Sequence, residues 1–247
     1  FRSAYQAGHV PGATFANVEE DLAGEKTGRN GRHPLPKRED LVEVFRDWGI
    51  DNYTQIVAYD AHGAQFAVRL WWLARWLGHA KVAVLDGGWQ AWLAKTNWSS
   101  SALPDRSRGA FEAREPLVTV ATAAELLTAR TDPATLLVDA RAPERFEGRA
   151  EPIDPVAGHI PGAVNRFWQA NLADGRFKPP QRLRGEFERL LAGRTPAQMV
   201  VYCGSGVTSC HHLLAMELAG LPGACLYAGS WSEWIADPQR PVAKGGA

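Results

Sequence analysis

The sequence contains little cysteine and no long apolar run, and these two shortages exclude several classes of protein. The three cysteines, Cys203, Cys210 and Cys225, are odd in number, lie in the last quarter of the chain and form no Cys-x-x-Cys pair. This pattern does not build a disulfide framework. No apolar stretch approaches the ~20 residues of a membrane-spanning helix. No charged and then apolar leader opens the sequence, so we expect a cytoplasmic protein without a membrane partner.

The charge composition shows no excess of either sign. The 27 Lys and Arg residues are matched by 27 Asp and Glu residues, and 45% of the chain is hydrophobic. This composition is typical of a soluble globular domain. Because a balanced chain has no overall field to attract a polyanion, we expect no nucleic-acid partner, and any anionic ligand must be bound locally.

Two landmarks occur twice in the same order, which indicates a duplicated domain. The hexamer Gly-His-Val-Pro-Gly-Ala at 8–13 returns at 158–163 with only Val changed to Ile. Downstream, Leu-Asp-Gly-Gly-Trp-Gln-Ala-Trp-Leu at 85–93 is matched by Tyr-Ala-Gly-Ser-Trp-Ser-Glu-Trp-Ile at 227–235, with both tryptophans in register. We therefore expect a first domain over 1–95, a linker over 96–116 and a second domain over 117–247.

Each copy shows strands that alternate with helices. Apolar runs at 56–59 and 199–202 are followed by a loop and by a helical stretch that ends at Gly78 or Gly220, and a second apolar run follows. This alternation predicts an α/β fold, with a parallel sheet covered by helices on both faces in each domain. The second copy has a further strand at 135–138 that the first copy lacks. We expect the natural chain to continue upstream of Phe1 and supply it.

Cys203 has the setting of an activated nucleophile. It follows directly on the apolar strand 199–202, and Gly-Ser-Gly-Val-Thr at 204–208 leads into a helix that begins near Ser209. The carboxyl end of a parallel strand, facing a helix N-terminus, is where open α/β sheets bind their ligands. Small residues let the backbone N–H groups of the loop converge on an anion, which favours a thiolate over a thiol.

Other chemistries of this loop fit less well. A cysteine phosphatase needs an Arg six residues after the nucleophile, where Ser209 stands. A hydrolase elbow needs Gly-x-Ser-x-Gly, and both positions that flank Ser205 are wrong. A zinc site of Cys203, Cys210 and the histidines at 211 and 212 matches no common spacing, so we expect no metal and no cofactor. We interpret Cys210 and Cys225 as small core residues.

The whole set of motifs resembles the tandem-domain rhodaneses, a family that includes thiosulfate and 3-mercaptopyruvate sulfurtransferases. The resemblance rests on the paired hexamers, Asp-Ala-Arg at 139–141, Arg-Phe-Glu-Gly at 145–148, the loop 203–208 and the stretch 229–234. It implies that only the second copy is catalytic, and Asp60 occupies the corresponding position of the first copy. It also implies a sulfurtransferase that carries sulfur as a Cys203 persulfide.

The resemblance bears on the sulfur donor. Thiosulfate enzymes of the family usually carry an Arg-Lys pair after the cysteine, whereas mercaptopyruvate enzymes resemble the Cys-Gly-Ser-Gly-Val-Thr found at 203–208. Mercaptopyruvate enzymes often place a second substrate Arg nine residues after the one that matches Arg145, and that position is Asp154 here. Arg149 is a nearby cation that could replace it. We expect 3-mercaptopyruvate as donor, with thiosulfate as the alternative and a non-catalytic binding module as an alternative of another class.

The resemblance also implies roles for individual residues. Ser205 corresponds to a serine that helps to protonate the departing enolate, and Arg145 would bind the donor's carboxylate. His9 matches a histidine assigned to proton relay, but bracing of the turn is the role that we favour for both His9 and His159. The remaining substrate-binding residues that we expect are Gly204, Gly206, Val207 and Thr208. The expected partners are a small-molecule sulfur donor and, as acceptor, a thiol, cyanide or thioredoxin.

Overall fold

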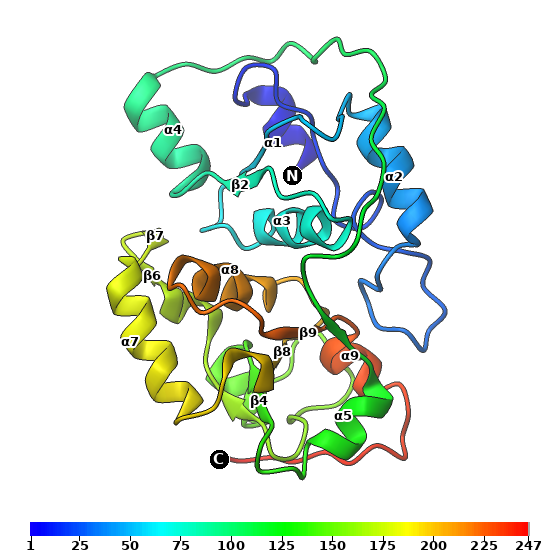
Figure 1. The fold of residues 1–247 in the computed structure, drawn as a ribbon, viewed down its shortest axis with the longest axis vertical. Coiled ribbons are helices and arrows are strands. Elements are labelled where there is room, and N and C mark those ends of the chain that lie inside the picture. Colours follow the sequence, from blue (N-terminus) through cyan, green and yellow to red (C-terminus); the bar gives the residue numbers. More distant parts are fainter. Residues whose placement is uncertain (247) are drawn as a thin grey trace. The chain divides into compact units, whose positions relative to one another are not determined.

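The computed structural model describes residues 1–246, which form two compact units (Figure 1). The first unit consists of Phe1–Gly24 and Pro36–Leu117. The second consists of Glu25–Leu35 and the chain from Val118 onward. The segment 25–35 thus belongs to the second unit, whereas the sequence analysis placed it in a first domain over 1–95.

The segment 96–116, expected as a linker, packs on the first unit instead of bridging freely. Phe111 is fully buried, with its ring 5.2 Å from that of Phe45. The Arg114 N–H also donates to the carbonyl of Leu77 at 2.8 Å. Burial of one aromatic ring is enough to anchor such a segment, and neither its composition nor its lack of period revealed this contact.

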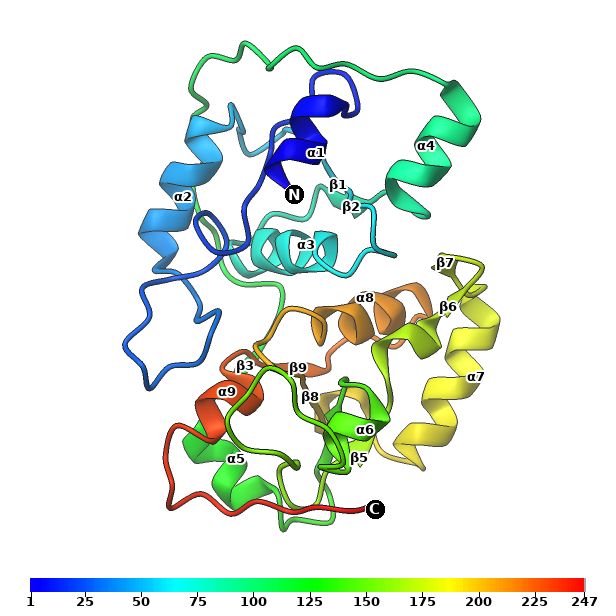
Figure 2. The ribbon, with the colours of Figure 1, turned by 180° about the vertical axis from the view of Figure 1, so that it is seen from behind.

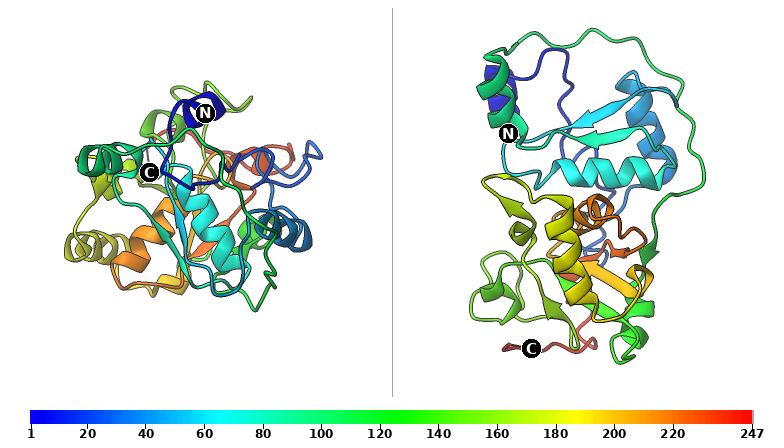
Figure 3. Two further views of the ribbon diagram at one scale, coloured as in Figure 1. Left: turned by 90° about the horizontal axis from the view of Figure 1, so that it is seen from above. Right: turned by 60° about the vertical axis from the view of Figure 1, so that its left-hand side comes forward.

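The first unit holds a short parallel sheet. Its elements are α1 (Arg2–Ala7), α2 (Arg38–Asp47), β1 (Ile56–Ala58), α3 (Ala67–Trp76), β2 (Val82–Val84) and α4 (Gly88–Thr96). β1 and β2 pair in parallel and both contact α3, beside which they run in Figure 3. The helix ends just before Gly78, whose φ of +81° is the conformation expected of a glycine that stops a helix.

The second unit is built on a larger sheet. Its helices are α5 (Ala123–Ala129), α6 (Pro143–Phe146), η1 (Trp168–Asn171), α7 (Pro180–Leu191), η2 (Pro196–Gln198), α8 (Cys210–Leu218) and α9 (Ser230–Trp234). Its strands are β3 (Val120–Ala121), β4 (Leu136–Asp139), β5 (Val164–Asn165), β6 (Leu172–Ala173), β7 (Arg176–Phe177), β8 (Met199–Tyr202) and β9 (Cys225–Tyr227). Within the described residues, five strands pair in parallel in the order β3-β9-β8-β4-β5, and β6 and β7 form a separate antiparallel pair.

Helices cover both faces of this sheet, as the sequence predicted (Figures 1 and 2). Leu137, Tyr202 and Tyr227 point to one face and pack against buried residues of α5 and α9. Residues alternate along a strand, so Val138, Val201 and Leu226 point to the other face, where α8 contacts β8 and β9 and packs on α7. The prediction of an α/β fold with parallel sheets is confirmed.

The repeated hexamer makes the same turn in both units. The Val10 N–H donates to the Tyr59 hydroxyl at 3.0 Å, and the Ile160 N–H donates to the Tyr202 hydroxyl at 3.2 Å. The hexamer therefore ties each turn to the end of the strand at 56–58 or 199–202. None of the helices described in residues 1–246 combines the length and apolar character needed to cross a bilayer.

Candidate active site

Cys203 lies at the carboxyl end of β8, a strand in the interior of the sheet between β9 and β4. The residue is 1% exposed and packs against Ala140 and Trp168. The following loop enters α8 at Cys210, with Ser209 as the N-cap. This is the strand, loop and helix arrangement that the sequence predicted around the thiol.

The loop is held by the start of α9, which lies within the stretch 229–234 that carries part of the family resemblance. The Ser230 hydroxyl accepts the Cys203 N–H at 3.1 Å and donates to the Tyr227 carbonyl at 2.9 Å. The Trp231 N–H donates to the Cys203 carbonyl at 3.0 Å, and the Ser232 N–H donates to the Gly204 carbonyl at 2.9 Å. Both peptide units around the thiol are thereby fixed from the start of α9. The repeat at 85–93 and 227–235 and the family resemblance both included this segment, but neither assigned it a role at the thiol.

Gly206 shapes the loop. Its φ is +76°, and a Cβ at this position would collide with the Ala228 carbonyl oxygen. Glycine is therefore required both for conformation and for space. Val207 is buried, and its carbonyl accepts the Cys210 N–H at 3.2 Å. The structure thus gives Gly206 and Val207 a part in forming the loop.

The environment of Cys203 favours its thiolate. Burial by itself raises the pKa of this thiol, but the hydroxyls of Thr208 and Ser209 and the backbone N–H groups of Ser205 and Ser209 lower it by more, so the net shift is downward. The Ser209 hydroxyl is buried and makes no hydrogen bond of ordinary geometry within the described residues. Its O–H is therefore available to the sulfur of Cys203, whose pKa it lowers. Thr208, expected as a substrate-binding residue, acts on the nucleophile.

The equivalent loop of the first unit already holds an anion. The Asp60 carboxylate accepts the N–H groups of His62, Ala64, Phe66 and Ala67 at 2.8 to 3.0 Å. Asp60 stands where Cys203 stands in the second copy, so its carboxylate fills a nest of the kind that lowers the pKa of the thiol. This unit has no cysteine, and its loop is occupied by its own side chain.

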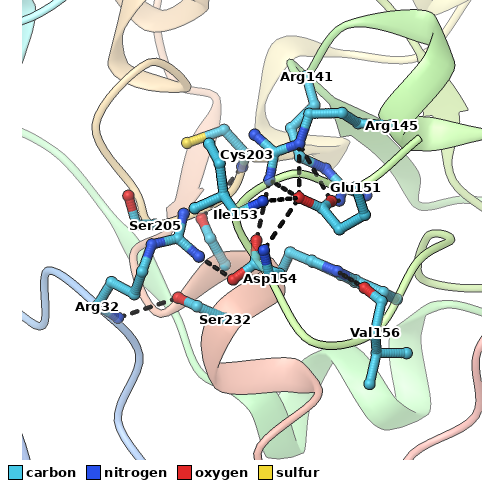
Figure 4. Close-up of polar contacts among 12 residues, drawn as sticks. Arg32, Arg141, Arg145, Glu151, Ile153, Asp154, Val156, Cys203, Ser205 and Ser232 are labelled. Carbon is cyan, nitrogen blue, oxygen red and sulfur yellow. Dashed lines mark hydrogen bonds and ion pairs between the residues drawn. The ribbon is translucent and has the colours of Figure 1, made fainter. Parts of the chain in front are cut away.

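Arg145 belongs to a row of alternating charges beside the loop (Figure 4). Its guanidinium contacts Glu151 at 2.7 Å and Asp154 at 2.9 Å. Arg141 contacts Asp139 at 2.7 Å and Glu151 at 3.2 Å. The row, in order of contact, is Asp139, Arg141, Glu151, Arg145, Asp154 and Arg32.

Arg32 is a site residue that the sequence analysis missed. It pairs with Asp154, and a Cβ on Gly204 would lie 2.8 Å from its Nη2 and 3.6 Å from both terminal nitrogens of Arg145. Two guanidiniums therefore lie next to the Gly204 backbone. Arg149, considered as a replacement cation, is 60% exposed and pairs with Glu147. No local pattern marked Arg32, because it is distant in sequence from the motif that carries the cysteine.

The histidine in contact with Ser205 is His33. Its Nδ1 lies 2.7 Å from the Ser205 hydroxyl. His9, expected as a relay, has Nδ1 2.7 Å from the Tyr5 carbonyl and Nε2 3.1 Å from the Ala102 carbonyl, all within the first unit. Both ring nitrogens of His9 are therefore engaged by the backbone, as expected for a residue that braces the turn. Of these two histidines, His33 is therefore the one in contact with Ser205.

Cys210, His211 and His212, at the start of α8, contact other groups of the protein interior. His211 and His212 are fully buried, and the Asn171 amide nitrogen lies 3.0 Å from Nδ1 of each. The Cys210 thiol donates to the Gly206 carbonyl at 3.4 Å. Between residues 1 and 246 no group of three or more His, Cys, Asp or Glu is arranged to hold a metal ion.

Comparison with known proteins decides the family. The model of the rhodanese-like domain matches residues 1–95 and 122–237, which is most of the chain. The chain belongs to the rhodanese-like family. The match falls on two stretches that contain the two hexamers found in the sequence.

Named relatives of this family resemble the chain over nearly its full length. A probable 3-mercaptopyruvate sulfurtransferase of Pseudomonas aeruginosa is 49% identical, over 98% of this chain and 86% of its own. A thiosulfate sulfurtransferase of Mus musculus is 36% identical, over 99% and 84%. Among solved structures, SseA from Escherichia coli, described as a 3-mercaptopyruvate sulfotransferase of rhodanese fold, superposes with a TM-score of 0.80 at 29% identity, over 93% of this chain and 86% of its own.

Proposed function

We propose that this protein is a sulfurtransferase that takes sulfur from 3-mercaptopyruvate, holds it as a persulfide on Cys203 and passes it to a thiol or to cyanide. Curated relatives with sulfurtransferase names at 49% and 36% identity support enzymatic sulfur transfer. The observation that carries the persulfide is the position of Cys203 between the end of β8 and the start of α8, where the hydroxyls and N–H groups of the following loop lower the pKa of its thiol. A thiolate is the form of cysteine that attacks sulfur.

The first half of the reaction balances with the groups present. The Cys203 thiolate attacks the sulfur of 3-mercaptopyruvate, an S–S bond forms, and the C–S bond breaks with its electron pair left on the departing enolate of pyruvate. The persulfide S–H and the enolate then exchange one proton, for which the Ser205 hydroxyl in contact with His33 is the route that we propose. The products are pyruvate and a Cys203 persulfide anion. Arg145 would bind the donor's carboxylate.

The persulfide keeps the charge of the thiolate. Its terminal sulfur would be stabilised by the donors that lower the pKa of Cys203, namely the Thr208 and Ser209 hydroxyls and the loop N–H groups. In the second half of the reaction, cyanide or a thiolate attacks the terminal sulfur and the Cys203 thiolate leaves. We propose thioredoxin as a physiological acceptor and the reducing cytoplasm as the setting, which suits a site that must return to a thiolate.

Two alternatives remain in the proposal. Thiosulfate would react by the same route with sulfite as the leaving group, and the 36% identity to a thiosulfate sulfurtransferase favours testing it. A binding module of the same fold would have no use for an activated thiol. The test is the mass of the purified protein. A persulfide, seen as an added mass of about 32 Da that cyanide removes, would exclude a non-catalytic binding module.

The deciding experiment measures kcat/KM for 3-mercaptopyruvate and for thiosulfate side by side, with cyanide as the common acceptor. We expect a preference of about tenfold or more for mercaptopyruvate, or about 1.4 kcal/mol in transition-state binding. Cys203→Ser must abolish transfer from either donor, whereas Cys210→Ala must retain most of it. Activity in Cys203→Ser would overturn the mechanism, and a preference for thiosulfate would overturn the choice of donor.

A further inference from the structure

The segment 25–35, here named the arginine loop, is anchored to the residues that hold the nucleophile. A Cβ on Gly31 would lie 2.8 Å from the Gly229 carbonyl oxygen and 3.0 Å from the Ser232 hydroxyl, so only glycine permits this approach. The Arg32 N–H donates to the Ser232 hydroxyl at 3.0 Å. The Ser232 N–H also donates to the Gly204 carbonyl. Ser232 therefore connects the arginine loop to the loop 203–208, here named the catalytic loop.

This anchoring places the Arg32 guanidinium beside Gly204. One terminal nitrogen, Nη1, pairs with Asp154, and the other, Nη2, lies nearest to the space that a residue-204 side chain would occupy. The Arg32 side chain is 31% exposed, whereas that of Asp154 is 2% exposed. The pair thus has a buried acidic end and an accessible cationic end. A planar guanidinium held in this way can offer its remaining N–H groups to an incoming anion.

Asp154 is shared between Arg32 and Arg145. Burial and the like charge of Arg145 lower the pKa of the Arg32 guanidinium, so an additional anion between the two arginines would relieve their repulsion. The row of three guanidiniums and three carboxylates has a net charge of zero, since 3 − 3 = 0. Arg32 and Arg145 lie beside the Gly204 backbone, and the carboxylate of Asp154, which pairs with both, offsets part of their positive charge.

We propose that Arg32 is the second donor-binding cation, which acts with Arg145 on the donor's carboxylate, and that Asp154 is the positioning residue that orients both guanidiniums and favours a donor of single negative charge. This inference rests on the proposed function. It assigns to the arginine loop a part in donor specificity. Near neutral pH 3-mercaptopyruvate has one negative charge and thiosulfate two, so the net charge beside Gly204 should separate them.

The first test compares Arg32→Gln with Arg29→Gln, an exposed arginine of the same loop. Arg32→Gln should raise KM for 3-mercaptopyruvate by about tenfold, with a smaller change in kcat, because a charge-assisted contact to the bound donor is lost. The melting temperature should fall only slightly, because Arg145 still pairs with the buried Asp154. Arg29→Gln should match the wild type. Equal KM values in the two variants would overturn the proposal.

A second readout does not depend on turnover. The rate of Cys203 alkylation by anionic iodoacetate, divided by that by neutral iodoacetamide, reports the positive charge near the thiol, and peptide mass spectrometry restricts it to Cys203. The ratio should fall severalfold in Arg32→Gln and stay constant in Arg29→Gln. If the wild type turned over neither donor while this ratio fell, Arg32 would stand as the anion-binding cation and the proposed function would fail. An unchanged ratio would overturn the role of Arg32.

The third test addresses Asp154. Asp154→Asn keeps the size of the side chain and removes one negative charge, so the row becomes net positive. The ratio of kcat/KM for thiosulfate to that for 3-mercaptopyruvate should rise severalfold. If both donors lose activity equally, Asp154 only supports the fold of the site, and its role in charge selection is overturned.

Discussion

His33 and Ser205 are in hydrogen-bond contact, with 2.7 Å between Nδ1 and Oγ, although 172 positions separate them in the sequence. The contact links the arginine loop directly to the catalytic loop, in addition to the link through Ser232. The neighbouring residue Arg32 pairs with Asp154. It supports a proton path that ends at Ser205, two residues after the nucleophile Cys203.

Loss of this contact should slow the reaction of the donor whose leaving group must be protonated. We expect His33→Ala and Ser205→Ala to lower kcat with 3-mercaptopyruvate by about 10- to 100-fold, in the range of general acid catalysis. Thiosulfate should be affected less, since departing sulfite needs no proton. Steady-state kinetics with both donors measure this, and His62→Ala, an exposed histidine, serves as control. An equal loss with both donors would contradict a proton-transfer role.

The nucleophile should titrate at a higher pH when Thr208 loses its hydroxyl. The Thr208 hydroxyl lowers the pKa of the Cys203 thiol, so Thr208→Val should move the midpoint of iodoacetamide alkylation to higher pH. A thiol whose folded-state pKa is lowered stabilises the fold at pH above its unfolded value, and this stabilisation is lost as pH falls through the folded value. In Thr208→Val the melting temperature should therefore gain less from a rise to alkaline pH than it does in the wild type. An unshifted alkylation profile would exclude Thr208 as a stabiliser of the thiolate.

Asp60 should stabilise the first unit. Asp60→Ala leaves four backbone N–H groups without their acceptor, and we expect a cost of about 2 to 4 kcal/mol in the free energy of unfolding. Asp60→Asn keeps one acceptor oxygen and should cost less. Denaturant unfolding monitored by tryptophan fluorescence gives both values. Identical stability of the two variants would show that the number of acceptors is irrelevant.

Gly206 should be far less replaceable than a glycine of the same backbone conformation in open space. Gly206 and Gly175 have φ of +76° and +73°, but only Gly206 has a backbone oxygen in the way of a Cβ. Gly175→Ala should cost about 1 to 2 kcal/mol for strain alone. Gly206→Ala should cost more and should also reduce persulfide loading, because the loop must shift. Comparable melting temperatures and loading in the two variants would contradict this.

The sequence was sufficient for the features that depend on local pattern. The runs at 56–59 and 199–202 are β1 and β8, Cys203 ends its strand, and the hexamers make matching turns. It was insufficient for contacts between segments that are far apart in the sequence. Arg32 and His33 reach the site because Gly31 fits against Gly229, a contact between two segments with no shared period.

The same limit bears on His9. The hexamer repeats, so a histidine in it was a natural candidate for a relay, yet its ring nitrogens serve the turn. The contact of the Ser230 hydroxyl with the Cys203 N–H was also not predicted, and it comes from a residue with an unusual φ of +55°. Positive φ at a serine is rare and leaves no sign in composition.

The two copies of the loop differ in whether their anion can be chemically modified. In the first unit the acceptor is the Asp60 side chain itself, so the four N–H groups around it have their partner without any ligand. In the second unit the anion is a sulfur that can be protonated, loaded or capped. Thiolate and persulfide both offer the surrounding donors a charged acceptor, but a neutral alkylated sulfur does not. Buried donors without an acceptor destabilise the unit that contains them. The melting temperature of the second unit should therefore report the chemical state of Cys203, while the first unit unfolds unchanged and provides an internal reference within the same chain.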